Sequence, residues 1–81
     1  MTYNEVMKIP VKYLLLNDYS IYEFNGGVVV CLLTNSSIIP LFEIYYNNRI
    51  YIKKPNYEFS DFTNKIKSCS RKEKIKRLLN E

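Results

Sequence analysis

Hydrophobic and polar residues alternate most regularly between Leu41 and Lys53, on either side of Tyr46-Asn47-Asn48. Such alternation predicts two strands that each bury one face, joined as a β-hairpin. A three-residue loop ending at Asn48 pairs Tyr45 with Arg49, and asparagine tolerates the left-handed conformation which that loop requires. A two-residue loop would mix polar and apolar side chains on both faces, so the longer loop is favoured. The predicted apolar face then consists of Phe42, Ile44, Ile50 and Ile52.

A second hairpin is predicted just before it. The strand Tyr19–Phe24 is followed by Asn25-Gly26-Gly27, and Asn-Gly suits both central positions of a type I′ turn. The next run, Val28–Leu33, is apolar at every position, which predicts a central strand covered on both faces by helices, another sheet or another subunit. Pro40 opens the following strand, where its missing donor must face an edge or a bulge.

The N-terminal region contains one clear helix and one ambiguous segment. Thr2 and Glu5 fit a capping box, which predicts a helix from Tyr3 to about Lys8, ended by Pro10. Val11–Leu16 fits a second helix that starts at Pro10, or a strand that turns at Asn17-Asp18 and pairs with Tyr19–Phe24. The strand would place Lys12 opposite Glu23 and Leu14 opposite Ile21. Both cross-strand pairs are favourable, so the strand is preferred.

The C-terminal region is predicted to be helical. Ser60 is a suitable N-cap for a helix beginning at Asp61, and the apolar residues Phe62, Ile66 and Cys69 recur at helical spacing. After a second capping box at Ser70–Glu73, the apolar stripe moves to another face, formed by Ile75, Leu78 and Leu79. This change predicts two short helices, 60–68 and 71–80, or one kinked helix.

Together these elements predict a single α+β domain. A short N-terminal helix precedes an antiparallel meander of four or five strands, and the C-terminal helical segment packs on one sheet face. The length of 81 residues and the 47% hydrophobic content agree with one folded domain. The longest apolar run, Val28–Leu33, is too short to cross a bilayer, and the N-terminus has no secretory pattern. We therefore expect a soluble, cytoplasmic protein without a membrane partner.

Composition argues against most catalytic chemistry. The chain has no histidine, and its two cysteines, Cys31 and Cys69, are 38 positions apart. Nucleophile–histidine pairs and zinc sites are therefore not expected, nor is a cofactor, and the cysteines are expected to be reduced thiols. We predict a non-enzymatic protein. A less favoured alternative is a metal-independent ribonuclease of the toxin type, formed by Glu43, Arg49, Tyr51 and Lys53. In it Glu43 is the base, and the two cations stabilise the reacting phosphate.

Charge is concentrated in the C-terminal part of the chain. Lys53–Arg77 contains nine Lys or Arg against three acidic residues, a balance of +6, whereas residues 1–52 have a balance of −1. Such a segment is commonly an ordinary solvated helix face, and the functional alternative is a surface for nucleic-acid phosphates. Among binding roles we favour nucleic acid. The predicted contacts on the helix are Lys65, Lys67, Arg71, Lys72, Lys74, Lys76 and Arg77. The outer hairpin face adds Arg49, Tyr51 and Lys53, where Tyr51 could stack an unpaired base.

A protein partner is the alternative to nucleic acid. Tyrosine is enriched at protein interfaces, so Tyr45 and Tyr51 are candidates for a homodimer or partner contact. Lys, Ile, Asn and Tyr make up 35 of the 81 residues, which suggests an A/T-rich genome such as those of many viruses, archaea and low-GC bacteria. In this hypothesis the chain is a viral or mobile-element adaptor or inhibitor that binds a host protein.

The chain lacks three sequence signatures of nucleic-acid-binding folds: an RNP-like octapeptide, a GXXG loop and a recognisable helix-turn-helix motif.

Overall fold

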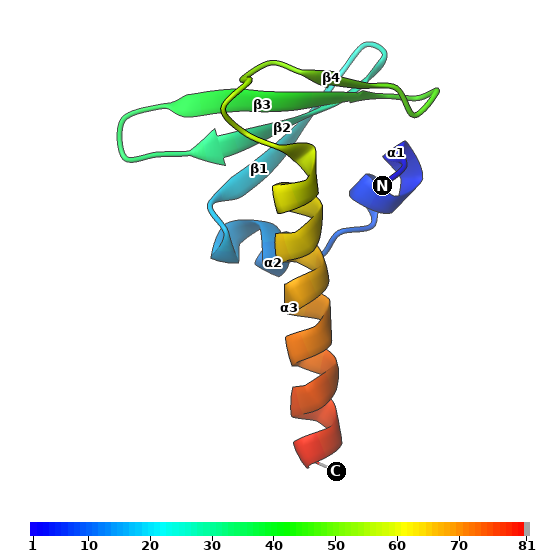
Figure 1. The fold of residues 1–81 in the computed structure, drawn as a ribbon, viewed down its shortest axis with the longest axis vertical. Coiled ribbons are helices and arrows are strands. Elements are labelled where there is room, and N and C mark those ends of the chain that lie inside the picture. The colour runs from blue at the N-terminus through cyan, green and yellow to red at the C-terminus, as the bar shows by residue number, and fades with distance from the viewer. Residues whose placement is uncertain (81) are drawn as a thin grey trace.

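The fold consists of a four-stranded antiparallel sheet with helices on one of its faces. The computed structural model describes residues 1–80. Its elements are α1 (Tyr3–Met7), α2 (Val11–Leu16), β1 (Tyr19–Phe24), β2 (Gly27–Leu33), β3 (Ile38–Tyr45), β4 (Ile50–Ile52) and α3 (Phe59–Asn80). The strands lie in the order β1-β2-β3-β4, a meander, and α3 points away from the sheet (Figure 1). The predicted α+β class, with a helix at each end of the meander, is confirmed.

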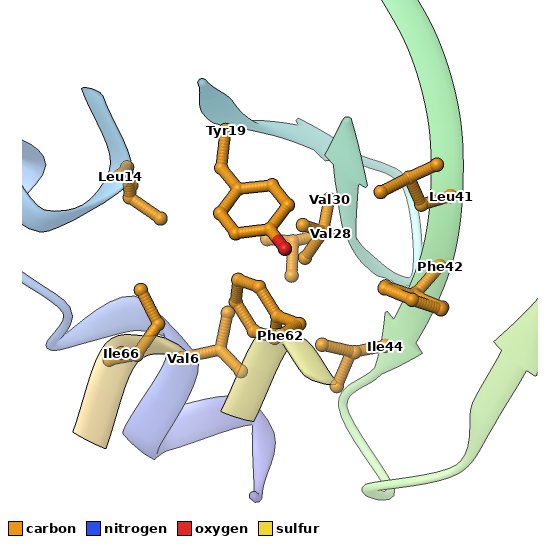
Figure 2. Packing of buried hydrophobic residues seen from close by; sticks show 10 residues of the cluster. All are labelled: Val6, Leu14, Tyr19, Val28, Val30, Leu41, Phe42, Ile44, Phe62 and Ile66. Carbon is orange, nitrogen blue, oxygen red and sulfur yellow. The ribbon is translucent and has the colours of Figure 1, made fainter. Parts of the chain in front are cut away.

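The hydrophobic core lies between the sheet and the three helices. Val6 of α1, Leu14 of α2, and Phe62 and Ile66 of α3 are all buried. Figure 2 shows these side chains and Tyr19 of β1 directed toward the inner residues of the central strands. A buried side chain of this size stabilises the fold by about 1.5–3 kcal/mol. The strand residues that complete the core are Val28, Val30, Leu41, Phe42 and Ile44.

The N-terminal helix forms as predicted. The backbone N–H of Glu5 donates to Thr2 Oγ1 at 3.3 Å, and the N–H of Thr2 donates to Glu5 Oε1 at 3.2 Å. This reciprocal pair is the capping box, and α1 ends at Met7 with Lys8 as its C-cap. The Tyr3 N–H also donates to Asn48 Oδ1 at 2.9 Å, which attaches α1 to the β3–β4 loop.

The segment Val11–Leu16 is a helix, so the preference for a strand was wrong. Pro10 is its N-cap, with φ −60°, and the backbone N–H of Tyr13 donates to the Pro10 carbonyl at 3.0 Å. The expected pairs of Lys12 with Glu23 and of Leu14 with Ile21 are absent, since β1 pairs with β2 alone. Leu14 is buried beneath the sheet instead, and this tertiary contact decides a segment whose local pattern fits both structures.

The β1–β2 turn differs from the predicted type I′ turn. Its central residues are Asn25 and Gly26, and only Gly26 has a positive φ, +126°. Gly27 already belongs to β2, where it pairs with Tyr45. A Cβ atom at Gly27 would lie 2.1 Å from the carbonyl oxygen of Ile44, so this glycine allows the close approach of β3.

The β3–β4 hairpin has the predicted register. The backbone N–H of Tyr45 donates to the Arg49 carbonyl at 2.9 Å, and Asn48 adopts the left-handed φ of +69°. Ile44 pairs with Ile50 and Phe42 with Ile52, as the three-residue loop requires. The two isoleucines of β4 were expected in the core, but both remain exposed because β4 is the short edge strand.

A bulge shapes the opposite end of β3. The β2–β3 register shifts between Val30 and Cys31, so Leu41 has no pairing partner in β2 and Pro40 pairs with Cys31. Pro40 therefore stands beside a bulge, as its missing donor predicted. The strand begins two residues earlier than expected, at Ile38.

The C-terminal segment is one helix of 22 residues without a break. The prediction of two helices, 60–68 and 71–80, was therefore wrong, and so was the start at Asp61, because α3 already begins at Phe59. Ser70–Glu73 has the composition of a capping box, but no new helix begins there because the chain does not leave the helical conformation. Arg71, Lys72 and Glu73 are good helix formers, so a helix already nucleated continues through them.

Candidate nucleic-acid interface

The contact between α2 and α3 is organised around Glu73. Its Oε1 accepts hydrogen bonds from Lys12 Nζ at 2.8 Å and from Arg77 Nη2 at 3.1 Å, while Tyr13 donates its hydroxyl hydrogen to Oε2. The bond from Lys12, followed by that from Tyr13, lowers the pKa of Glu73 from 4.5 to about 2. The same contact raises the pKa of Tyr13. Glu73 is thus a charged clamp that ties the first turn of α2 to α3.

Beside this clamp lies an open groove of about 560 Å³ between α2 and α3. Tyr13, Leu16 and Cys69 contribute its less polar surface. Charged residues line it as well: Lys12, Lys72, Lys76 and Arg77, together with Glu73. Four cations against one carboxylate make this groove suited to an anion that also carries an apolar group.

The structure brings together three of the seven helix residues predicted from sequence. Lys72, Lys76 and Arg77 line the groove. Three others lie on a second side of α3, since they are four and seven residues apart: Lys67, Arg71 and Lys74. The seventh, Lys65, lies nearer the sheet, with its Nζ 5.7 Å from the centre of the Tyr19 ring.

The cations of α3 are largely free of acidic partners. Within residues 1–80, Arg77 is the only one of the seven that forms an ion pair, and its partner is Glu73. Glu73 is also the only acidic residue in the described part of the chain after Asp61. Positive charge on this helix is therefore available to a ligand rather than consumed internally.

Sequence reasoning missed the contribution of α2. Lys12, Tyr13 and Leu16 line the groove, but the preferred strand would have placed Lys12 across from Glu23. The helical alternative would have grouped these three residues, because residues at spacings of three and four share one side of a helix. Pro10, which suits the start of a helix, also favoured the helical alternative.

The predicted sheet-face residues lie far from this groove. Arg49, Tyr51 and Lys53 follow the outer-face alternation of β4, opposite the face that the helices cover (Figure 1). None of the three lines the groove. Lys53 Nζ is 3.5 Å from Glu43 Oε1, and Tyr51 stands across from Glu43. The four residues suggested for a ribonuclease do share this face.

The outer sheet face has no helix over it. The predicted interface residue Tyr51 is 60% exposed, and Tyr22 and Ile38 are exposed as well. Tyr45 is half-buried because its ring meets the edge of Phe24, with centroids 5.6 Å apart. The apolar strand Val28–Leu33 was expected to be covered on both faces, and within this chain it is covered on one.

The end of α3 exposes a second apolar surface. Ile75, Leu78 and Leu79 are 57%, 73% and 81% exposed. At 3.6 residues per turn they lie on the side of α3 away from Glu73. They are therefore not part of the groove.

Three further features of the described residues concern metal binding, membrane spanning and free thiols. No three His, Cys, Asp or Glu side chains within residues 1–80 are grouped as metal ligands. No helix in the same range has the length and apolar character needed to cross a membrane. Cys31 and Cys69 are free thiols, and burial raises the pKa of Cys31.

Comparison of the chain with protein-family models, curated proteins and solved structures gives no match. Function is therefore inferred from the chain's own residues.

Proposed function

We propose that this chain is a non-enzymatic nucleic-acid-binding protein whose main contacts come from α3 and α2. The observation that supports this best is the shortage of acidic residues on a strongly cationic helix. Residues 65–80 contain seven Lys or Arg and one acid, Glu73, which already binds Lys12, Tyr13 and Arg77. Phosphate groups are the abundant ligands that neutralise such a surface.

The shape of α3 supports the same function. Its C-terminal part extends beyond the sheet, so its side chains are accessible from several directions (Figure 1). Each Lys or Arg that meets a phosphate releases condensed counterions, and affinity then falls steeply as salt is added. No base-specific contact is needed, so we expect weak discrimination between sequences.

The test is a charge reversal at Lys72, Lys74 and Lys76 to Glu. With a labelled nucleic acid at ~50 mM salt, we expect affinity to fall by about 100-fold or more, because repulsion replaces the attraction of three lysines for phosphate. On a DNA duplex, the slope of log affinity against log salt should also decrease by about 2.7 in magnitude, at ~0.9 for each phosphate that is no longer neutralised. Fluorescence anisotropy across a salt series measures both quantities.

The matched control changes Lys8, Lys54, Asn35 and Asn56 to Glu, which changes net charge equally but lies outside α3 and outside the predicted sheet-face contacts. We expect this control to bind within several-fold of the unaltered protein. Equal losses in the two variants would mean that net charge rather than α3 drives binding. Absence of binding by the unaltered protein at ~50 mM salt would reject the proposed function itself.

A second candidate is protein interaction through the outer sheet face. Tyr22, Ile38 and Tyr51 are exposed there without a covering element. A homodimer or host-protein complex would bury them, and tyrosine is common at such interfaces. The molecular mass measured by sedimentation tests the homodimer. A dimeric protein that becomes monomeric with Tyr51→Glu would support it. A monomeric protein at all concentrations would contradict it.

A further inference from the structure

The groove between α2 and α3 combines two properties that a simple phosphate-binding surface does not need. Tyr13 and Leu16 offer a ring and an aliphatic side chain, while Lys12, Lys72 and Lys76 surround them with positive charge. A nucleotide has the complementary pair of properties, a flat base with a π-face and an anionic phosphate. The volume of about 560 Å³ also lies within the usual range of small-ligand sites.

We propose that this groove accepts an unpaired nucleotide of a single-stranded nucleic acid. The base packs against Tyr13 and Leu16, and the flanking phosphates bind Lys72 and Lys76. This inference rests on the proposed function and narrows it, because it assigns the preferred ligand as a single strand. In a duplex the bases are stacked and paired, so none can enter the groove without being flipped out.

The clamp at Glu73 holds the site in a defined shape before the ligand arrives. Glu73 accepts a hydrogen bond from the hydroxyl of Tyr13. This bond restrains the tyrosine ring at the wall of the groove. It also binds Lys12 of α2 and Arg77 of α3, and so keeps the two walls together. A wall ordered in advance lowers the entropy cost of binding.

Lys72 and Lys76 are placed to hold the strand on either side of such a base. They are four residues apart, so they lie on the same side of α3, one turn from each other. Within residues 1–80 neither forms an ion pair. Their ammonium groups are therefore free for successive phosphates of an extended strand.

The first test compares a short oligothymidylate with a duplex of equal length by fluorescence anisotropy. We expect the protein to prefer the single strand. Tyr13→Leu should weaken single-strand binding by between about 5-fold and 150-fold, the range for removal of one stacked base, and leave duplex binding unchanged. Tyr13→Phe keeps the ring and removes the bond to Glu73, and it should remain within about threefold of the unaltered protein.

The control is Tyr22→Leu, which removes an exposed ring from the outer sheet face at a position outside the predicted nucleic-acid contacts. It should leave binding of both nucleic acids unchanged. Circular dichroism confirms that each variant is folded. Equal affinity of the unaltered protein for single strand and duplex, or equal effects of Tyr13→Leu and Tyr22→Leu, would overturn the inference while leaving the proposed function in place.

A second measurement avoids substitution altogether. A single strand containing 5-iodouridine is photocrosslinked to the unaltered protein, and the modified residue is identified by mass spectrometry. Crosslinking at Tyr13 is expected, and crosslinking confined to Tyr22 or Tyr51 would overturn the inference. Absence of salt-dependent binding to either nucleic acid would overturn the proposed function as well, so the two failures are distinguishable.

Discussion

The two halves of α3 share one continuous helix but differ in what surrounds them. In the first half, Phe62 is fully buried and Ile66 is 6% exposed. In the second half, Leu78 and Leu79 are 73% and 81% exposed, and the surrounding residues are mostly cationic. One half is held by the core, whereas the other extends from it (Figure 1).

This difference shows how a small protein can support an exposed helix. An isolated helix of about ten residues is marginal in water, because nucleation is unfavourable. Here the packed half supplies the nucleus, and residues 71–80 only extend it. Helix-forming Lys, Arg and Glu, a basic residue in the last turn, and the Glu73 clamp then maintain the extension.

The largest expected effect comes from removing a side chain in the packed half. Phe62→Ala should lower the free energy of unfolding by about 3–5 kcal/mol, because it opens a cavity between α3 and the sheet. Chemical denaturation measures this change. Leu79→Ala, the matched truncation in the exposed half, should stay within about 0.5 kcal/mol. Similar losses of stability in both variants would contradict the division of α3.

A proline in each half provides the next comparison. Lys67→Pro breaks the helix where it packs on the sheet and should destabilise the protein by about 3 kcal/mol or more. Lys74→Pro breaks it in the extension, where we expect local loss of helix and a change in the global unfolding free energy below about 1 kcal/mol. Far-UV circular dichroism and denaturant titration separate the two outcomes. If Lys74→Pro instead lowered the free energy of global unfolding as much as Lys67→Pro, the extension would belong to the same cooperative unit as the core.

The smallest expected effect concerns pH and the Glu73 clamp, which joins α2 to the second half of α3. The pKa of Glu73 falls from 4.5 to about 2 in the folded state, so its contribution to stability is present above pH 4.5 and is lost as pH falls toward 2. The thermal midpoint of Glu73→Gln should therefore lie below that of the unaltered protein at pH 7, and the difference should disappear near pH 2. A difference independent of pH would contradict the ionic clamp.

The candidate site could be predicted only in part. The cations of α3 were evident from composition, and Lys72, Lys76 and Arg77 do meet in the groove. Tyr13 was not foreseen, because its role depends on α2 being a helix and on Glu73 lying across from it. Glu73 is 60 positions away from Tyr13, and no local pattern reveals a contact at that separation.

The sequence alone determined the parts of the fold that depend on neighbouring residues. The capping box of Thr2 and Glu5 and the loop ending at Asn48 follow from local hydrogen bonding and backbone preference. The loop in turn sets the β3–β4 register. Tertiary structure decided the rest, because the local alternatives were close in free energy. Burial of Leu14 favoured helix over strand in α2, and packing of Phe62 supplied the nucleus from which α3 continues to Asn80.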